Sequence, residues 1–283
     1  RQVALPEIGA AGQARLARSS AIVVGAGGLG SPALLYLVGA GVGRVAFVDF
    51  DRVDESNLHR QILHRTQDVG RPKVESARRA IRDCNPEVQV DAVPERFSED
   101  NARRLLHEYD LVVDGTDNFP TRYLVNDAAV LEHRPVVHGS IYYYEGQIAV
   151  FDADRGPCYR CLFPDPPDPG SVPSCAEAGV LGVLPGLVGV AQATEAVKLL
   201  TGIGTPLIGR LVIYDALKMS FRRLTVKRNP ECPVCGENPS IAEARTIDWS
   251  CRLPDADVPQ MDVAAYRDIR DSGQNHLLLD VRE

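Results

Sequence analysis

The sequence predicts an α/β protein with a doubly wound sheet, an antiparallel extension and a zinc knuckle. Short apolar runs alternate with helical patterns along the chain, which is typical of βαβ units. A glycine loop, Gly25–Gly30, follows the first apolar run and leads into a helical pattern. Four of the seven cysteines form two C-x-x-C pairs, a spacing typical of zinc knuckles.

Most elements of the first half have a sequence signal at one end. The helix after the glycine loop should end near Gly41, because glycine favours helix ends. Asn85-Pro86 should stop a later helix, since the residue before proline avoids the α region. Ser98 can cap the next one. We expect strands at Ser20–Val24, Arg44–Asp49, Val88–Ala92, Leu111–Asp114 and Pro135–Gly139, and helices at Ser31–Ala40, Lys73–Cys84, Ser98–His107 and Asn118–Glu132.

The second half predicts the antiparallel extension. Gln147–Asp152 should be extended and antiparallel to the strand before it. The apolar stripe of Leu187–Leu200 predicts a helix that stops at Gly202. Leu211–Tyr214 and Phe221–Lys227 should close the sheet as a strand pair. The long stretches without such order are 163–174 and 236–259.

Composition and charge exclude several classes of protein. The net charge of −7 does not indicate nucleic-acid binding, which would need clustered positive charge. No apolar run approaches the roughly 20 residues that span a bilayer. Residues 1–13 lack the apolar core of a signal peptide. The chain opens at Arg1 without a methionine, as a trimmed sequence would. We expect a cytoplasmic protein with no membrane or nucleic-acid partner.

The glycine loop is a full G-x-G-x-x-G motif between a strand and a helix. Strand, glycine turn, helix, second strand and acid are the parts of a nucleotide site. Glycines let the backbone approach phosphate, and the helix start offers free N–H groups. Asp49, which ends the second strand, can accept a ribose hydroxyl. This pattern alone leaves NAD and ATP both open. The glycines of the motif are Gly25, Gly27, Gly28 and Gly30.

Further polar residues follow later strand ends. In an open parallel sheet, ligands bind beyond the carboxyl ends of the strands, so Arg60, Lys73 and Asp117 can converge above the glycine loop. A lysine at a helix start is electrostatically unfavourable, and a bound phosphate would remove that objection. Two cations and a carboxylate able to hold Mg²⁺ suit a triphosphate better than a nicotinamide. Taken singly, each could be an ordinary surface charge.

The paired cysteines are candidate metal ligands. The x-x spacing of Cys158/Cys161 and Cys232/Cys235 lets both sulfurs of a pair reach one tetrahedral ion. Without a secretory signal, two such pairs indicate zinc rather than disulfides. A redox dithiol is the alternative. A shared zinc site requires the fold to bring two distant segments together.

Taken together, these residues resemble the MoeB/ThiF adenylating enzymes, which are relatives of the ubiquitin-activating E1 enzymes. The ordered set that carries the resemblance runs from Arg1 to about Glu237: Gly25–Gly30, Asp49, Ser56–Gln61, Lys73, Gly115–Asn118 and both cysteine pairs. The resemblance implies a Rossmann-like sheet that forms a homodimer. It also implies Mg-ATP-dependent adenylation of the C-terminal Gly-Gly carboxylate of a ubiquitin-like sulfur-carrier protein. Molybdopterin, thiamine, tRNA-thiolation and cysteine or siderophore pathways all stay open.

The resemblance also assigns roles to single residues. Asp117 would lie near Mg²⁺, and Arg1 would reach the ATP of the other subunit. Cys158, Cys161, Cys232 and Cys235 would bind Zn²⁺. The residues expected around ATP are Gly25, Gly27, Gly28, Gly30, Asp49, Ser56, Asn57, Leu58, His59, Arg60, Lys73, Asp117 and Asn118.

The region after the first cysteine pair suggests sulfur chemistry. Cys175 belongs to neither pair and follows a proline-rich stretch, at a place where the family carries a reactive cysteine. Its thiolate could form a thioester with the carrier, or resolve a persulfide from a sulfur donor such as a cysteine desulfurase or a rhodanese. A cysteine without chemistry is the alternative. Residues 276–283, after a helical pattern at Asp262–Ser272, resemble the start of a rhodanese domain. An ordinary αβ appendage is the alternative.

We therefore expect an adenylating domain at 1–237, a linker at 238–259 and an incomplete rhodanese-like domain at 260–283. Two other functions stay open at this point. An NAD(P) oxidoreductase would use the same glycine motif with Asp49. A non-catalytic scaffold would keep the fold alone, but Arg60, Lys73 and Asp117 argue against it.

Overall fold

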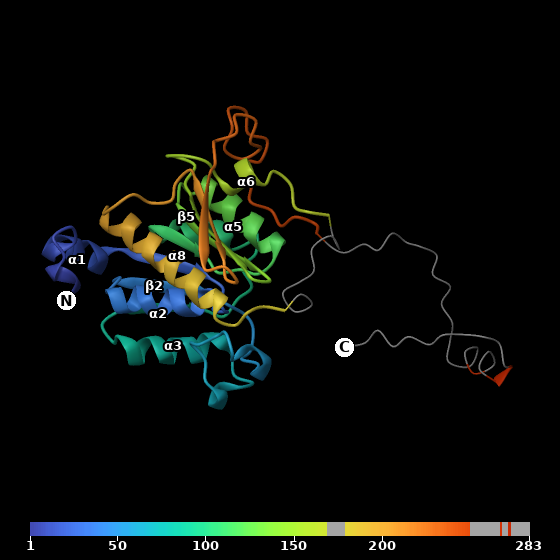
Figure 1. Ribbon diagram of the computed structural model, residues 1–283, viewed down its shortest axis with the longest axis horizontal. Helices are drawn as coiled ribbons and strands as arrows, with labels where there is room; N and C mark the ends of the chain where they lie inside the picture. Colours follow the sequence, from blue (N-terminus) through green and yellow to red (C-terminus); the bar gives the residue numbers. More distant parts are fainter. Residues whose placement is uncertain (169–178, 250–266, 268–270, 273–283) are drawn as a thin grey trace. The chain divides into compact units, whose positions relative to one another are not determined.

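The computed structural model describes residues 1–168, 179–249, 267 and 271–272 (Figure 1). The chain divides into the units Arg1–Trp249 and Ser250–Glu283. Cys175 and most of the expected rhodanese-like start lie outside the described residues. The helices of the first unit are α1 Gly9–Arg18, α2 Gly30–Ala40, α3 Lys73–Cys84, α4 Ala102–His107, α5 Phe119–Leu131, α6 Tyr159–Leu162 and α8 Leu184–Thr201. The strands are β1 Ser20–Val24, β2 Arg44–Val48, β3 Gln89–Val93, β4 Leu111–Asp114, β5 Val136–Tyr142, β6 Glu145–Phe151, β7 Arg210–Asp215 and β8 Ser220–Thr225.

An eight-stranded sheet runs through the first unit in the order β3-β2-β1-β4-β5-β6-β7-β8. The strands from β3 to β5 are parallel, and β6, β7 and β8 continue the sheet in antiparallel pairs. This confirms the predicted antiparallel extension. Val24 of β1 pairs with Val48 of β2 on one side and with Asp114 of β4 on the other. The carboxyl ends of three strands therefore lie side by side.

Helices cover both faces of the sheet (Figure 1). Ala21 and Val23 of β1 belong to the apolar cluster that includes α2, α3 and α8, whereas Ile22 and Val24 belong to the cluster with α4 and α5. Successive side chains of a strand point to opposite faces, so an entirely apolar strand needs cover on both. This arrangement confirms the doubly wound prediction.

The predicted bounds match at β1, α3 and β4, and differ elsewhere for local reasons. The predicted helix start at Ser98 is wrong, because α4 begins at Ala102. Residues 98–101 form a turn that leads into the helix, in which the carbonyl oxygen of Ser98 accepts the N–H of Ala102 at 2.8 Å and Asn101 Oδ1 accepts the N–H of Ser98 at 2.9 Å. α8 begins at Leu184 rather than Leu187, and α1 and α6 have no counterpart in the prediction. Among the described residues, no helix combines the length and the apolar character needed to cross a membrane.

Candidate functional site

The glycine loop packs tightly at the end of β1. Gly25 has a φ of +95°, a conformation that side-chain-bearing residues rarely adopt. A Cβ on Gly30 would lie 1.9 Å from the carbonyl oxygen of Gly25, so only glycine fits at this position. The loop leads directly into the N-terminal end of α2, which favours anions. The backbone thus makes the tight turn into a helix that the sequence pattern predicts.

Asp49 fastens the end of β2 to this loop. Its carboxylate is buried, its Oδ2 accepts the backbone N–H of Ala26 at 2.8 Å, and its Oδ1 accepts that of Asp51 at 2.9 Å. A carboxylate has about four acceptor positions, so Asp49 can hold the loop and still accept a further hydroxyl. The sequence indicates only the second of these two roles.

Lys73, at the start of α3, has a carboxylate partner. Its side chain is 6% exposed, and its Nζ lies 2.9 Å from Oδ2 of Asp51. The Asp51 carboxylate offsets the charge of a lysine at a helix N-terminus, so a bound phosphate is not needed to explain Lys73. Sequence reasoning missed Asp51 as a partner, although it is the second acid at the end of β2.

The segment Ser56–Gln61 folds into a turn beside the glycine loop. Asp54 begins this turn, since its Oδ1 accepts the backbone N–H of Ser56 at 2.9 Å, and hydrogen bonds from Ser56 lower the pKa of Asp54. The Arg60 guanidinium donates to Asn57 Oδ1, and its Cδ would lie 3.6 Å from a Cβ on Gly28. Ser56 and His59 are exposed, whereas Asn57, Leu58 and Arg60 are half-buried.

The residues just before α8 cover this segment, and the first turn of α8 covers the glycine loop. A Cβ on Gly182 would lie 2.7 Å from His59 Cδ2, and one on Gly28 would lie 3.1 Å from Pro185 Cβ. The sequence prediction starts this helix at Leu187 and therefore leaves out the turn that covers the glycine loop. The proline at the start of the helix was the available signal, because proline is favoured in a first turn.

The loop after β4 lies against the glycine loop. A Cβ on Gly115 would lie 2.9 Å from the carbonyl oxygen of Gly25. Asn118 caps α5, because its Oδ1 accepts the backbone N–H of Thr121 at 2.9 Å. Asp117 is exposed between these two points. Carboxylates of this exposed kind are the oxygen ligands that divalent cations prefer.

A buried charge cluster lies beneath that loop. Asp114 Oδ2 accepts from His138 Nδ1 at 3.1 Å and lies 3.4 Å from Nε of Arg122. Burial opposes the charge on Asp114, but His138 and Arg122 outweigh burial and hold the pKa of Asp114 below its usual range. Burial lowers the pKa of His138, so a neutral His138 donates to an ionised Asp114. The sequence shows the acid but not its partners.

Gln192 connects α8 to the carboxyl end of β4 and to the amino end of β5. Its Nε2 donates to the carbonyl oxygens of Asp114 at 2.7 Å and Val137 at 3.0 Å, and its side chain is fully buried. A Cβ on Gly139 would lie 2.5 Å from Cδ of Gln192. Nothing in the sequence marks this glutamine, because its role depends on contacts between distant segments.

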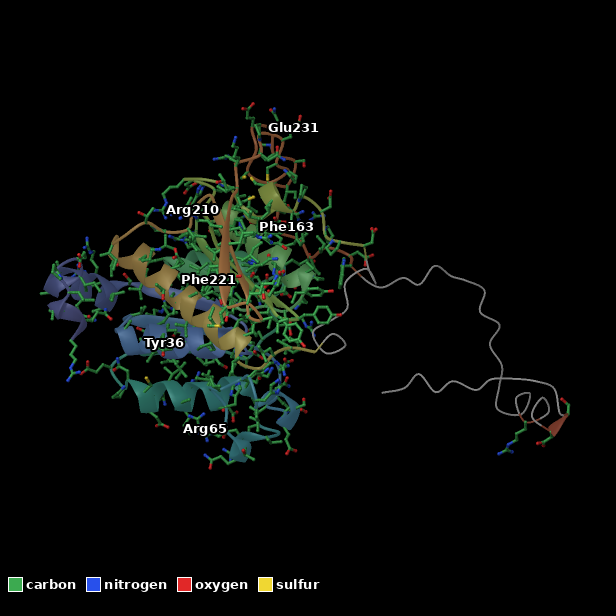
Figure 2. All side chains as sticks on the ribbon, viewed as in Figure 1. Tyr36, Arg65, Phe163, Arg210, Phe221 and Glu231 are labelled. Atoms are coloured by element: carbon green, nitrogen blue, oxygen red, sulfur yellow. The ribbon has the colours of Figure 1, made fainter. Side chains whose placement is uncertain are left out.

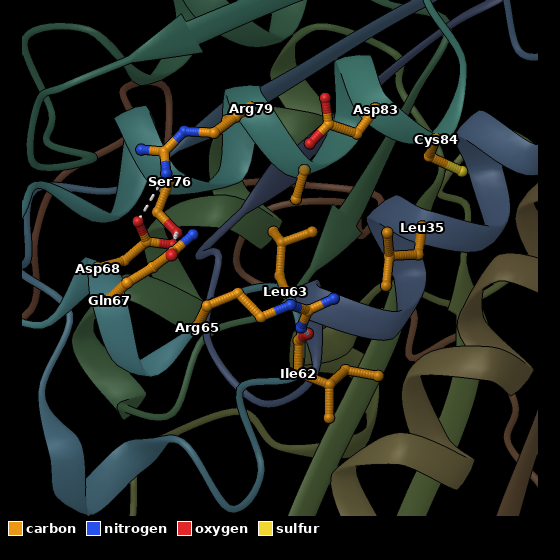
Figure 3. Close-up of a pocket in the computed structure, with 11 residues that line it drawn as sticks. Leu35, Ile62, Leu63, Arg65, Gln67, Asp68, Ser76, Arg79, Asp83 and Cys84 are labelled. Atoms are coloured by element: carbon orange, nitrogen blue, oxygen red, sulfur yellow. Dashed lines mark hydrogen bonds and ion pairs between the residues drawn. The ribbon is translucent and has the colours of Figure 1, made fainter.

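A cavity of about 380 Å³ lies between α2 and α3 (Figure 3). Its polar wall is Asp68, which accepts from Ser76 Oγ at 2.8 Å and pairs with Arg79 at 2.8 Å. His64 links this wall to the glycine loop, through Nδ1 to Ser76 Oγ at 2.9 Å and Nε2 to the carbonyl oxygen of Ala26 at 3.1 Å. None of the expected ATP ligands lines the cavity, so it is distinct from the glycine-loop site.

The four paired cysteines come together in a second cluster. Cys158 Sγ lies 3.9, 3.5 and 3.4 Å from the sulfurs of Cys161, Cys232 and Cys235. Four sulfurs about 2.3 Å from a tetrahedral ion would be about 3.8 Å apart, so this cluster could hold a metal ion. A hydrogen bond with Cys158 lowers the pKa of Cys161, which favours a thiolate there. The prediction that distant segments meet here is confirmed.

Arg1 is exposed and lies away from the glycine loop of its own chain. Gln2 donates to Gln13 Oε1 at 3.3 Å, and Gln13 donates to the carbonyl oxygen of Ala40 at 2.9 Å. Ala40 ends α2, whereas the glycine loop begins it, so about 16 Å of helix separates the two regions. The structure therefore does not bring Arg1 to the other expected ATP ligands of the same chain.

Curated relatives resemble this chain along most of its length. A sulfur carrier protein adenylyltransferase of Thermus thermophilus is 58% identical over 258 residues, covering 89% of this chain and 95% of the relative. A SAMP-activating enzyme E1 of Haloferax volcanii is 53% identical over 255 residues, covering 89% and 94%. A probable adenylyltransferase/sulfurtransferase MoeZ of Mycobacterium tuberculosis is 48% identical over 293 residues, covering 100% and 73%.

A solved structure and a family model also match this chain. The crystal structure of Escherichia coli MccB with ATP has a TM-score of 0.67 and 21% sequence identity, covering 80% of this chain and 69% of that chain. At that identity the likeness shows the fold alone. The ThiF family model matches residues 1–234. The chain belongs to the ThiF family.

Proposed function

We propose that the chain is an adenylyltransferase that uses Mg-ATP to activate the C-terminal Gly-Gly carboxylate of a ubiquitin-like sulfur-carrier protein. The observation that carries the proposal is the grouping of Arg60, Asp49 and Gly115 around the glycine loop, with Lys73 held at Asp51. The relatives named adenylyltransferase support this reading. They give no support to the alternative of an NAD(P) oxidoreductase.

The chemistry follows from charge. A carboxylate will not attack ATP unaided, because both are anionic. Loop N–H groups, Arg60 and Lys73 would offset the triphosphate charge and stabilise the departing pyrophosphate. No protein base is needed, since a C-terminal carboxylate has a reference pKa of about 3.3–3.7 and is already ionised at neutral pH. The product is an acyl-adenylate, which a sulfur nucleophile can attack.

Two metal ions fit the donor sets present. Asp117 is an exposed carboxylate of the kind that holds Mg²⁺ beside phosphates. When bound there, Mg²⁺ would neutralise charge on the phosphate oxygens. The four cysteines would hold Zn²⁺ in a closed tetrahedral site with no open position, and the sulfur–sulfur distances of 3.4 to 3.9 Å support this assignment.

A homodimer explains the position of Arg1. A residue about one helix length from its own glycine loop can act on ATP only if it reaches the site of a partner subunit. Val3 and Leu5, in the same segment, are 46% and 52% exposed. Apolar side chains of this size next to an exposed arginine suit a subunit interface.

The antiparallel end of the sheet suits the body of the carrier. β8 is the edge strand, and all its residues are exposed. Phe221 and Met219 are 61% and 72% exposed, and Figure 2 shows Phe221 on this strand. An exposed edge strand with apolar side chains can accept a further strand or an apolar partner face. Phe221→Asp should then raise the KM for the carrier and leave that for ATP unchanged; equal carrier KM values would exclude this surface.

Sulfur transfer is the finer part of the proposal. Cys175 would attack the acyl-adenylate or resolve a persulfide from a cysteine desulfurase or a rhodanese. Cys175→Ala should leave ATP–pyrophosphate exchange intact and slow formation of the carrier thiocarboxylate; an unchanged rate would exclude the role. We also propose an adenylating domain at 1–237, a linker at 238–259 and the start of a rhodanese-like domain at 260–283. We propose that the protein is cytoplasmic.

Carrier-dependent ATP–pyrophosphate exchange tests the proposed function. The chain is assayed with Mg-ATP and a panel of ubiquitin-like proteins that end in Gly-Gly. Each carrier has a matched control that lacks its last glycine. Exchange with one intact carrier and not with its control is the expected result. Absence of exchange with every carrier, or a reaction with a nicotinamide cofactor, would contradict the proposal.

A further inference from the structure

Trp249 is the sole tryptophan of the chain and the last residue of the first unit. Its indole N–H donates to the carbonyl oxygen of Pro167 at 2.6 Å. Its ring centre lies 5.2 Å from that of Phe119, with the planes at 56°. Aromatic pairs attract one another at this separation. One side chain therefore contacts both the proline-rich segment and the start of α5.

The contact with Phe119 connects Trp249 to the loop that carries Asp117. Phe119 is the first residue of α5, and the Arg122 guanidinium lies 5.7 Å from its ring centre. Arg122 Nη2 donates to the carbonyl oxygen of Thr116 at 3.2 Å. Asp117 thus lies between Thr116 and Phe119. Phe119 contacts the indole directly, and Thr116 is linked to it through Arg122 and Phe119, so the position of the ring constrains this loop.

The Pro167 contact has a support of its own. Arg160 is buried and pairs with both carboxylate oxygens of Asp127 in α5, at 2.7 and 2.8 Å. Its Nη1 donates to the carbonyl oxygen of Pro164 at 3.0 Å. The segment that receives the indole N–H is therefore itself fixed to α5. Trp249 therefore has two fixed partners, Pro167 at its indole N–H and Phe119 at its ring.

We propose that Trp249 is a positioning residue that sets the Asp117 loop for Mg-ATP. The inference rests on the proposed function, in which Asp117 holds Mg²⁺. Because Phe119 touches the ring and the loop follows Phe119, loss of the ring should weaken the binding of Mg-ATP more than the turnover of bound ATP. Occupancy of the site should in turn change the emission of the indole.

Two measurements on the whole chain test this inference. Trp249→Ala should raise the KM for Mg-ATP in pyrophosphate exchange by about fivefold or more, with kcat within about twofold. Trp249→Phe keeps an aromatic ring and should restore the KM to within about twofold of wild type. Arg245→Ala is the matched control, because it removes a side chain of the same segment that pairs with Glu243. In wild type, Mg-ATP should change tryptophan emission with a midpoint near the KM.

The outcomes separate the inference from the proposed function. Normal KM values in Trp249→Ala, or a raised KM that Trp249→Phe does not restore, would overturn the positioning role even if emission changes. If Mg-ATP does not change the tryptophan emission of wild type, Trp249 is not coupled to the ATP site. If Trp249→Ala does not fold, Trp249→Leu carries the same test, since it offers Phe119 no aromatic face. Absence of exchange in wild type would count against the proposed function instead.

Discussion

Asp49 Oδ2 accepts the backbone N–H of Ala26 at 2.8 Å, which joins the end of β2 to the glycine loop after β1. The same carboxylate is the expected acceptor for the ribose of ATP. One buried side chain would thus shape the phosphate loop and fix the sugar. The first role contributes to folding and the second to ATP binding, so each has its own measurement.

Asp49→Asn should weaken both folding and ATP binding. An amide nitrogen cannot accept a hydrogen bond, so one buried backbone N–H loses its partner, which costs about 1–3 kcal/mol of the free energy of unfolding. Urea denaturation and the KM for ATP measure the two effects. Asp110→Asn is the control, because Asp110 accepts the N–H of Ser20 at the other end of β1. An ATP KM no higher in Asp49→Asn than in Asp110→Asn would exclude a ribose contact.

The cysteine cluster should retain about one zinc ion per chain after purification without added metal. Elemental analysis of wild type measures the stoichiometry. Cys232→Ser should lose the metal, because a closed site needs all four sulfurs. Cys84→Ala, which removes an exposed thiol outside the cluster, should keep it. A disulfide within either C-x-x-C pair under reducing conditions would contradict a zinc site.

Arg1 should act across the subunit interface. Arg1→Ala and Asp117→Ala subunits should each be poorly active, because each lacks one part of every site. Mixed dimers would contain one composite site with both residues present, so mixing should restore part of the pyrophosphate exchange. The measurement requires confirmed subunit exchange, for example by native mass spectrometry. Full mixing without any recovery would show that the sites are not shared.

Stability should fall as the pH drops below about 6.5, because His138 is buried and neutral. Its pKa is lower in the folded chain than in the unfolded chain, so the unfolded chain binds more protons in this range. The free energy of unfolding should therefore decrease on acidification, by up to about 1.4 kcal/mol per pH unit for this histidine.

Urea denaturation of variants at several pH values checks the assignment to His138. His138→Asn keeps a donor toward Asp114 but cannot take up the extra proton, so it should flatten the slope. His133→Gln replaces an exposed histidine and should leave the slope unchanged. Equal slopes in wild type and His138→Asn would show that another group is responsible.

Local sequence signals account for most of the fold. Residues Ser20–Val24 and Lys73–Cys84 match β1 and α3, because apolar periodicity and a proline stop fix both elements locally. The C-x-x-C spacing likewise predicts the cysteine cluster. The start of α4 is less well predicted, because residues 98–101 form a turn that leads into the helix at Ala102.

Contacts between distant segments account for what the sequence does not show. Asp51 pairs with Lys73, and Gln192 of α8 reaches the carboxyl end of β4 and the amino end of β5. Trp249 meets Phe119 only when the end of the unit folds back. Such partners follow from tertiary packing, so neither periodicity nor a motif reveals them.

Carrier-dependent ATP–pyrophosphate exchange by Asp117→Ala tests the central claim most directly. Loss of the carboxylate that would hold Mg²⁺ should lower exchange by about a hundredfold or more. Zinc content and melting temperature should stay those of wild type, since Asp117 is exposed. Asp83→Ala is the control, because Asp83 lines the separate cavity of Figure 3. The account predicts exchange lost in Asp117→Ala and kept in Asp83→Ala; near-wild-type exchange by Asp117→Ala would contradict it.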